Sequence, residues 1–85
     1  MTLTESFEDA QKRVKTLKES PGNDELLELY ALYKQATVGD ATGSRPGMLD
    51  FVGRAKFDGW AKRKGTSKDA AMTAYVATVD RLMKK

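Results

Sequence analysis

Two tyrosines and a lysine lie within one short stretch of the chain, at Tyr30, Tyr33 and Lys34. In a helix, residues three or four positions apart lie on one strip, so these side chains, followed by Thr37, would face one direction. Tyr hydroxyls donate hydrogen bonds, Lys supplies a compact cation, and an aromatic ring can stack on a base. Such a strip could face a phosphorylated ligand. The same spacing also fits two core tyrosines beside a solvated lysine, and spacing alone favours that interpretation.

Two further cations, Arg54 and Lys56, alternate with the small residues Gly53 and Ala55. Small residues let a ligand approach the backbone closely while the cations neutralise its charge. The run at 62–64 is more basic, but a charge run at the end of an amphipathic helix usually indicates a solvated face. The pattern at 53–56 permits an anion contact without requiring one.

The chain contains neither Cys nor His. The usual zinc and transition-metal ligand sets are therefore missing, as are the commonest general base and every Ser-His or Cys-His nucleophile system. Gly39, Gly43 and Gly47 do not form a phosphate loop, because that motif requires Gly-Lys-Ser/Thr. The composition argues against a metal site and against catalysis.

The elements that must position these residues are helices. Thr2 and Glu5 have the spacing of a capping box, and apolar residues follow in helical register until residues 20–22 (Ser-Pro-Gly) end the first helix. The apolar positions of the first helix are Phe7, Ala10, Val14 and Leu17. After this helix, Asn23 or Asp24 is expected to cap a second one.

The second helix carries the tyrosine strip and is expected to end at Gly39, which suits a left-handed C-terminal position. Three Gly and one Pro in residues 39–50 predict a long ordered loop. Asp50 or Phe51 opens a third helix that Gly65 ends, and residues 66–69 begin a fourth, in a capping-box-like pattern. No alternating pattern predicts a strand.

The whole chain, with 85 residues, is expected to form one domain over 1–85. A formal charge of +3 and a pI of 9.3 suit either a phosphorylated small ligand or nucleic acid. The acidic N-terminus lacks the features of a secretory signal, and no apolar run approaches about 20 residues. We expect a cytoplasmic protein with no stable membrane insertion.

Four segments are more specific than these patterns, and together they resemble the signature of the acyl-CoA-binding protein family. They are YKQATVGD at 33–40, RPGMLDF at 45–51, AKFDGW at 55–60 and KGTSKDA at 64–70. The resemblance extends over essentially the whole chain. The sequence departs from the usual family pattern at Phe57, often Trp, and at Val52, often Lys. Ser20 also replaces a residue that is often basic beside the nucleotide region.

The resemblance implies an all-α four-helix bundle of up-down-down-up topology with one long overhand loop, and a bowl-shaped site for one long-chain acyl-CoA. Carried over by position, contacts to the ribose 3′-phosphate fall on Tyr30, Lys34 and Lys56. Lys15 and Tyr75 would line the nucleotide site, and Tyr33 belongs to the same strip. The resemblance further implies a non-catalytic carrier and buffer of fatty acyl-CoA. Such a carrier needs no cofactor, does not bind nucleic acid and can act as a monomer.

Two alternatives from other classes stay open on the sequence. A basic helical domain could bind nucleic acid through 62–64 and through Arg81, Lys84 and Lys85. A small thioesterase would require an activated nucleophile that a chain without His and Cys hardly offers. Leu26 and Leu27, one turn before Tyr30, either form an apolar floor for an acyl chain or simply pack helices.

Overall fold

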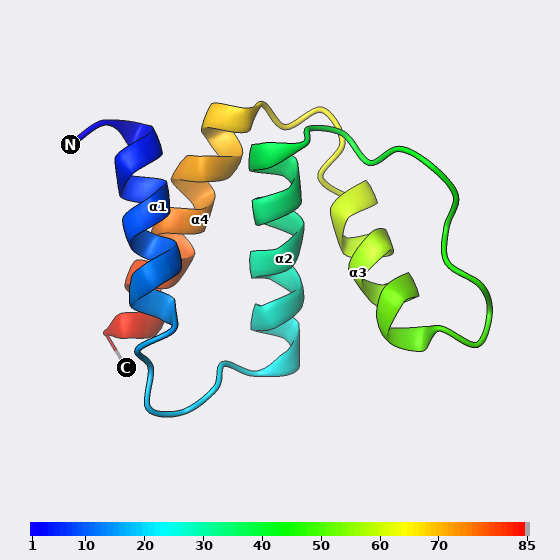
Figure 1. Ribbon diagram of the computed structural model, residues 1–85, viewed down its shortest axis with the longest axis horizontal. Coiled ribbons are helices and arrows are strands. Elements are labelled where there is room, and N and C mark those ends of the chain that lie inside the picture. Colours follow the sequence, from blue (N-terminus) through cyan, green and yellow to red (C-terminus); the bar gives the residue numbers. More distant parts are fainter. Residues whose placement is uncertain (85) are drawn as a thin grey trace.

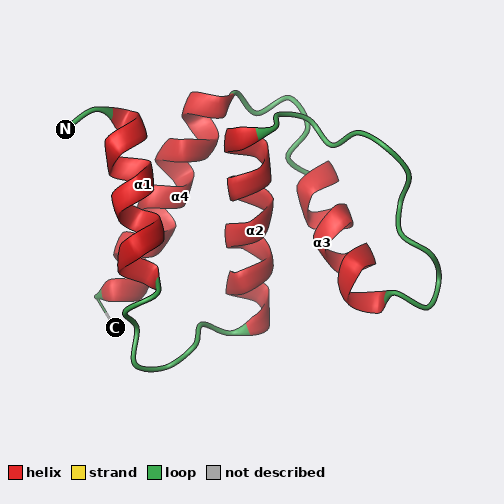
Figure 2. Cartoon of the chain, in the orientation of Figure 1, coloured by secondary structure: helices red, strands yellow, loops and turns green. Residues whose placement is uncertain are grey.

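The computed structural model describes residues 1–84 and contains four helices and no strand in that part of the chain (Figures 1 and 2). The helices are α1 (Leu3–Val14), α2 (Asn23–Thr37), α3 (Phe51–Ala61) and α4 (Lys68–Met83). Helices α1 and α4 run in one direction, and α2 and α3 run in the opposite direction (Figure 1). The predicted all-α bundle of up-down-down-up topology is confirmed. Lys85, one of the basic residues of the nucleic-acid alternative, lies outside the described residues.

The helices pack in the order α1, α4, α2, α3, and α1 makes no close backbone approach to α2 within residues 1–84. One core joins α1, α2 and α4, and each buried large apolar side chain contributes roughly 1.5–3 kcal/mol. The core consists of Phe7, Ala10, Leu29, Leu32, Ala36, Ala71, Tyr75, Val79 and Leu82. Helix α3 lies outside this core, at the edge of a flat molecule of 38 × 28 × 15 Å. A flat arrangement with a space between α1 and α2 leaves room for an open site.

The beginnings of three helices follow the expected capping chemistry. Thr2 and Glu5 form a reciprocal capping box at α1, and the Asp50 carboxylate accepts a 2.9 Å hydrogen bond from the Gly53 backbone N–H. Ser67 caps α4, so the cap lies one residue after Thr66, where the predicted box began. A side-chain oxygen at these positions satisfies an N–H that the helix itself leaves without a partner.

The expected cap of α2 is wrong, because Gly22 occupies the N-cap position with extended backbone angles and no side-chain cap. Asn23 and Asp24 lie inside the first turn instead. There the Asp24 carboxylate interacts favourably with the positive end of the helix dipole.

Two helices end earlier than predicted. Helix α1 ends at Val14 rather than near Ser20, because Thr16 turns back to the Arg13 carbonyl with both its backbone N–H and its hydroxyl. Helix α3 ends at Ala61, and turns with bonds between residues three apart continue to Gly65. The positive φ angles of Gly39 (99°) and Gly65 (90°) confirm the left-handed turns expected there.

One amide side chain joins the turns that follow α2 and α3. Gln35, which is fully buried, donates to the Asp40 carboxylate at 2.9 Å and to the Thr66 carbonyl at 2.8 Å. The same Asp40 oxygen accepts from the Gly65 N–H at 2.9 Å. We call this group, Gln35, Asp40, Gly65 and Thr66, the turn latch. It fixes the C-terminal end of α3 against that of α2.

An ion pair fastens the long loop of residues 39–50 to α3. The Arg45 guanidinium donates two hydrogen bonds to Asp58, at 2.9 and 2.6 Å. The hydrogen bond from Arg45 is the main reason that the pKa of Asp58 lies below its usual value. Within residues 1–84, no helix is long and apolar enough to cross a membrane.

Candidate functional site

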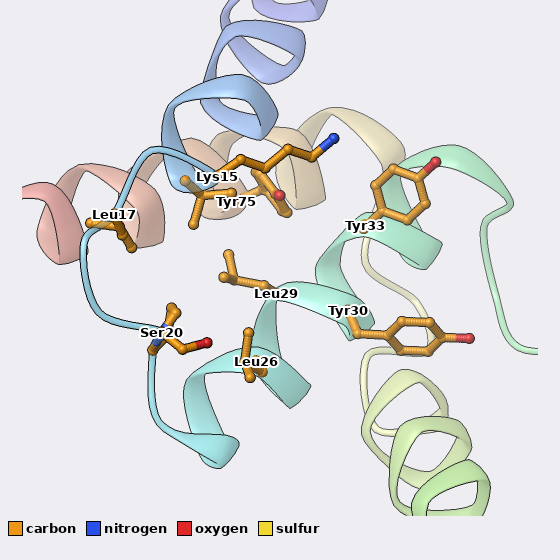
Figure 3. A pocket seen from close by; sticks show the side chains of 10 residues that line it. Lys15, Leu17, Ser20, Leu26, Leu29, Tyr30, Tyr33 and Tyr75 are labelled. Carbon is orange, nitrogen blue, oxygen red and sulfur yellow. The ribbon is translucent and has the colours of Figure 1, made fainter.

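A pocket of about 470 Å³ opens between the end of α1, the 15–22 connection and α2 (Figure 3). Its volume lies in the range of small-molecule sites. The expected site residues Lys15, Tyr30, Tyr33 and Tyr75 all line it. Its apolar walls are Val14, Leu17, Pro21, Leu26 and Leu29. The structure therefore brings four of the six expected residues to one open, largely apolar pocket.

Phe7 joins two of these tyrosines into an aromatic cluster. Its ring lies 5.0 Å from the Tyr75 ring, edge to face, and 6.1 Å from the Tyr33 ring, in a stacked orientation. Tyr75 is 6% exposed, and burial, followed by the nearby Tyr33, raises its pKa. The Tyr75 phenol therefore stays protonated at neutral pH and can donate a hydrogen bond to an anionic ligand without adding charge.

Lys15 supplies positive charge at the rim of the pocket. It follows directly after α1, and its ammonium extends over the pocket towards the Tyr33 side (Figure 3). Because the residue is exposed, its ammonium can meet a ligand without a large desolvation cost.

The other expected cations lie where α2 meets α3. Lys56 of α3 places its Nζ 5.3 Å from the centre of the Tyr30 ring, and Tyr30 points from the pocket towards α3 (Figure 3). Lys34, one turn after Tyr30, places its Nζ 5.1 Å from the centre of the Trp60 ring. Each aromatic face attracts its ammonium and holds it in place.

Neither of these two ammonium groups forms an ion pair within residues 1–84. Lys34 and Lys56 therefore keep positive charge available beside the phenol of Tyr30. Two cations and a hydrogen-bond donor from different helices suit an anion with several oxygens, such as a phosphate monoester.

Trp60 is itself held in place, because its indole N–H donates to the Gly39 carbonyl at 2.7 Å. Gly39 directly precedes Asp40 of the turn latch. The surface on which Lys34 rests is thus fixed by the same turns that join α2 to α3.

Leu26 and Leu27, considered together as a floor, lie on different sides of α2. Leu26 lines the pocket, whereas Leu27 faces α3 and lines a second hollow of about 520 Å³ with Ala55 and Gly59. Adjacent residues in a helix point in different directions, so the pair cannot form one surface. Of the two leucines, only Leu26 lines this pocket.

Sequence reasoning missed Phe7, Leu17 and Pro21 as parts of the site, whereas the family resemblance had already placed Ser20 beside the nucleotide region. The spacing of Phe7 and Leu17 indicated only core positions. Ser20 and Pro21 reach the pocket because helix α1 ends early and the chain turns beneath it. The spacing of apolar residues does not predict this turn.

The basic residues of the nucleic-acid alternative do not gather on one face. Residues 62–64 follow the end of α3, whereas Arg81 and Lys84 lie at the end of α4, at the opposite end of the molecule (Figure 1). A groove-tracking basic stripe would need them together. The described residues also contain no group of acidic side chains that could hold a metal ion.

Comparison with known proteins identifies this architecture. The family model described as "Acyl CoA binding protein" matches residues 4–79. Acyl-CoA-binding protein homolog 1 of Caenorhabditis elegans is 58% identical over 98% of this chain and 96% of the relative. The homolog of Manduca sexta is 51% identical over 98% of this chain and 93% of the relative.

Solved structures agree with the sequence comparison. Acyl-CoA-Binding Protein 2 of Oryza sativa superposes with a TM-score of 0.92 at 42% identity, covering 98% of this chain and 92% of the other. The protein of Moniliophthora perniciosa gives a TM-score of 0.90 at 42% identity, covering 99% and 82%. Since the family match, the full-length relatives and the superposed folds coincide, the chain belongs to the acyl-CoA-binding protein family.

Proposed function

We propose that this chain binds long-chain fatty acyl-CoA esters, one per molecule and without chemical conversion, and acts as their carrier and buffer. The observation that carries the proposal is the junction of α2 and α3. There Lys34 and Lys56 flank Tyr30 without ion-pair partners among the described residues, directly beside an apolar pocket. A ligand with a phosphorylated head and an apolar tail matches both parts.

The head group would be anchored at this junction. The 3′-phosphate of CoA carries close to two negative charges, and each charge-assisted hydrogen bond contributes about 1.5–3 kcal/mol. We assign Tyr30, Lys34 and Lys56 to the phosphate. Lys15, Tyr33 and Tyr75, at the pocket, are assigned to the rest of the nucleotide.

The acyl chain would add affinity through burial. Each methylene removed from water contributes about 0.8 kcal/mol, so covering half of a sixteen-carbon chain contributes roughly 6 kcal/mol before ordering costs. Chain length should therefore control affinity more strongly than small changes at the head group. Leu26 and Leu29 offer apolar surface for this contact within the pocket.

In this proposal the whole chain, residues 1–85, acts as one acyl-CoA-binding domain. A monomer suffices, because every assigned residue comes from one chain. A cytoplasmic location suits a carrier that exchanges its ligand between enzymes. No cofactor takes part, since binding alone needs none.

Calorimetric titration with palmitoyl-CoA tests the proposal, with free CoA and palmitate as controls at physiological salt. One-to-one binding of palmitoyl-CoA, far tighter than of either control, is expected because only the ester presents both parts. Absence of heat with palmitoyl-CoA would refute it. Release of free CoA on incubation would instead indicate a thioesterase.

A further inference from the structure

Trp60 lies beside the candidate binding residues without lining the pocket. The residue is only 8% exposed, and it is not among those around the pocket. Trp60 belongs to the last turn of α3 and Lys34 to the last turn of α2, and these turns lie at the same end of the molecule (Figure 1). The Lys34 Nζ is 5.1 Å from the centre of the Trp60 ring. A tryptophan in this place has little surface to offer a ligand, but it can act on a ligand through Lys34.

A closed series of contacts fixes the Trp60 ring relative to Lys34. The Gly39 N–H donates to the Lys34 carbonyl at 3.2 Å, and the Gly39 carbonyl accepts the Trp60 indole N–H at 2.7 Å. The Trp60 ring then meets the ammonium of the same lysine. The backbone and the side chain of Lys34 are therefore both tied to one turn, and the position of the ring follows the position of this turn.

Packing against a second aromatic ring also restrains the indole. Phe57, one turn earlier in α3, lies 6.3 Å from the Trp60 ring at an interplanar angle of 74°. Aromatic pairs favour this edge-to-face arrangement, and a buried indole N–H needs an acceptor, so the two contacts together define the plane of the ring. The face of a Trp ring attracts an ammonium more strongly than the face of a Tyr or Phe ring does. The indole is therefore a fixed surface on which a flexible lysine side chain can rest.

The two cations assigned to the phosphate would otherwise drive each other apart. Lys56 lies over the Tyr30 ring at 5.3 Å, and Tyr30 is one turn before Lys34 in α2. Because like charges repel, a Lys34 ammonium without its ring would move away from Lys56 into solvent. We infer that Trp60 is a positioning residue, which holds the Lys34 ammonium at the place proposed for the ligand phosphate. The benefit to ligand binding rests on the proposed function, whereas the hold on Lys34 does not.

Proton NMR of the full chain without ligand tests the hold on Lys34. Protons above the face of an aromatic ring are shielded, so the Cε protons of Lys34 should resonate upfield of those of Lys62, an exposed lysine after α3. The upfield shift should disappear in Trp60→Leu, which removes the ring. Lys34 protons at the position of the Lys62 protons in the wild type would overturn the inference.

Calorimetry tests the consequence for binding. Trp60→Leu should bind palmitoyl-CoA about fivefold more weakly than the wild type, because the cation–π contact no longer holds the ammonium. Palmitoyl-CoA without its 3′-phosphate should bind the wild type and Trp60→Leu equally. The double variant Trp60→Leu/Lys34→Ala should bind palmitoyl-CoA like Lys34→Ala alone, since Trp60 acts through Lys34. Trp60→Phe, which keeps an aromatic face, should recover part of the affinity.

A matched control is Val79→Ala, which removes volume from a fully buried core position of α4 and so destabilises the fold without touching Trp60. It should bind both ligands like the wild type. If Trp60→Leu does not fold, the wild-type Lys34 shifts and Trp60→Phe decide the question.

Two binding results would overturn the inference. One is a loss in Trp60→Leu that is equally large for the ligand without the phosphate, and the other is a loss that persists in the Lys34→Ala background. Wild-type protein that does not bind palmitoyl-CoA would instead refute the proposed function, and upfield Lys34 protons would then still show that Trp60 holds the ammonium.

Discussion

Lys34 and Lys56 reach the same corner of the molecule from different helices, and each rests on an aromatic ring. Their ammonium groups lie 5.1 Å from the Trp60 ring centre and 5.3 Å from the Tyr30 ring centre. The cation–π contact restrains each side chain without neutralising it. Less entropy is then lost when a ligand phosphate arrives, which suits a binding site that must exchange its ligand.

Replacing Lys34 by alanine should weaken palmitoyl-CoA binding at least tenfold, because one charge-assisted hydrogen bond contributes about 1.5–3 kcal/mol. The fold should persist, since Lys34 is not part of the core. Calorimetry measures the affinity and circular dichroism the helix content. The control Lys62→Ala removes an exposed lysine after α3 and should leave affinity unchanged. Unchanged affinity of the Lys34 variant would sink the phosphate assignment.

At this scale the sequence predicted the strip of Tyr30, Tyr33 and Lys34, because helical spacing alone places them together. It could not show that Lys56 meets Tyr30, since that contact depends on how α3 packs against α2. Lys15 and Tyr75 looked unremarkable by themselves and became candidates only through the family resemblance. The sequence could not identify Phe7 as a site residue, because its spacing indicates only a core position and does not show that it contacts two tyrosines of the pocket.

The helices were predictable where side-chain chemistry is local. Each cap, at Thr2, Asp50 and Ser67, bonds to a backbone N–H three positions further along the chain. The two glycines with left-handed backbone angles were likewise predictable as turn positions. The end of α1 was not predictable, because apolar spacing continues to Leu17 while the chain already turns at Thr16. That early turn creates the 15–22 wall of the pocket.

The turn latch should control how firmly α3 is held. In Gln35→Leu, the Thr66 carbonyl loses its donor and the Asp40 carboxylate loses one of two, so we expect a loss of roughly 1–3 kcal/mol in the free energy of unfolding. Trp60 is the single tryptophan of the chain, and its emission should shift as the Gly39 turn loosens. Urea unfolding and fluorescence measure both effects.

Gln11→Leu provides the matched control, because Gln11 makes a single 3.4 Å hydrogen bond within α1. It should change the stability by less than about 0.5 kcal/mol and leave the tryptophan emission as it was. If Gln35→Leu were as stable as this control, the latch would have no role in holding α3.

For the whole molecule, stability should form a plateau across neutral pH with a loss at each end. Burial raises the pKa of Tyr75 above its ordinary 10.0. The contribution of Tyr75 to the free energy of unfolding is therefore fully present below pH 10 and is lost as the pH rises through the pKa of Tyr75 in the folded state. Hydrogen bonds from Gly65 and from Arg45 lower the pKa values of Asp40 and Asp58 below 3.8. Their contribution is present above pH 3.8 and is lost as pH falls through the folded pKa values.

Thermal unfolding followed by circular dichroism between pH 2 and pH 11 checks this profile. The melting temperature should fall at both ends, and Tyr75→Phe should reduce the alkaline fall because that group no longer titrates. A melting temperature that rises steadily above pH 10 in the wild type would contradict the burial of the Tyr75 hydroxyl. At this scale the topology came from the resemblance, since amphipathic spacing predicts four helices but not their directions.

Whether Lys34 holds the 3′-phosphate is tested most sharply by removing the phosphate from the ligand and the ammonium from the protein in one thermodynamic cycle. Palmitoyl-CoA and its analogue without the 3′-phosphate are titrated calorimetrically into the wild type and Lys34→Ala. We expect loss of the phosphate to weaken wild-type binding about tenfold or more and to weaken binding to the variant much less, because the two groups interact directly. Equal losses in both proteins would show that Lys34 does not hold the phosphate, and no binding of palmitoyl-CoA to the wild type would refute the proposed function itself.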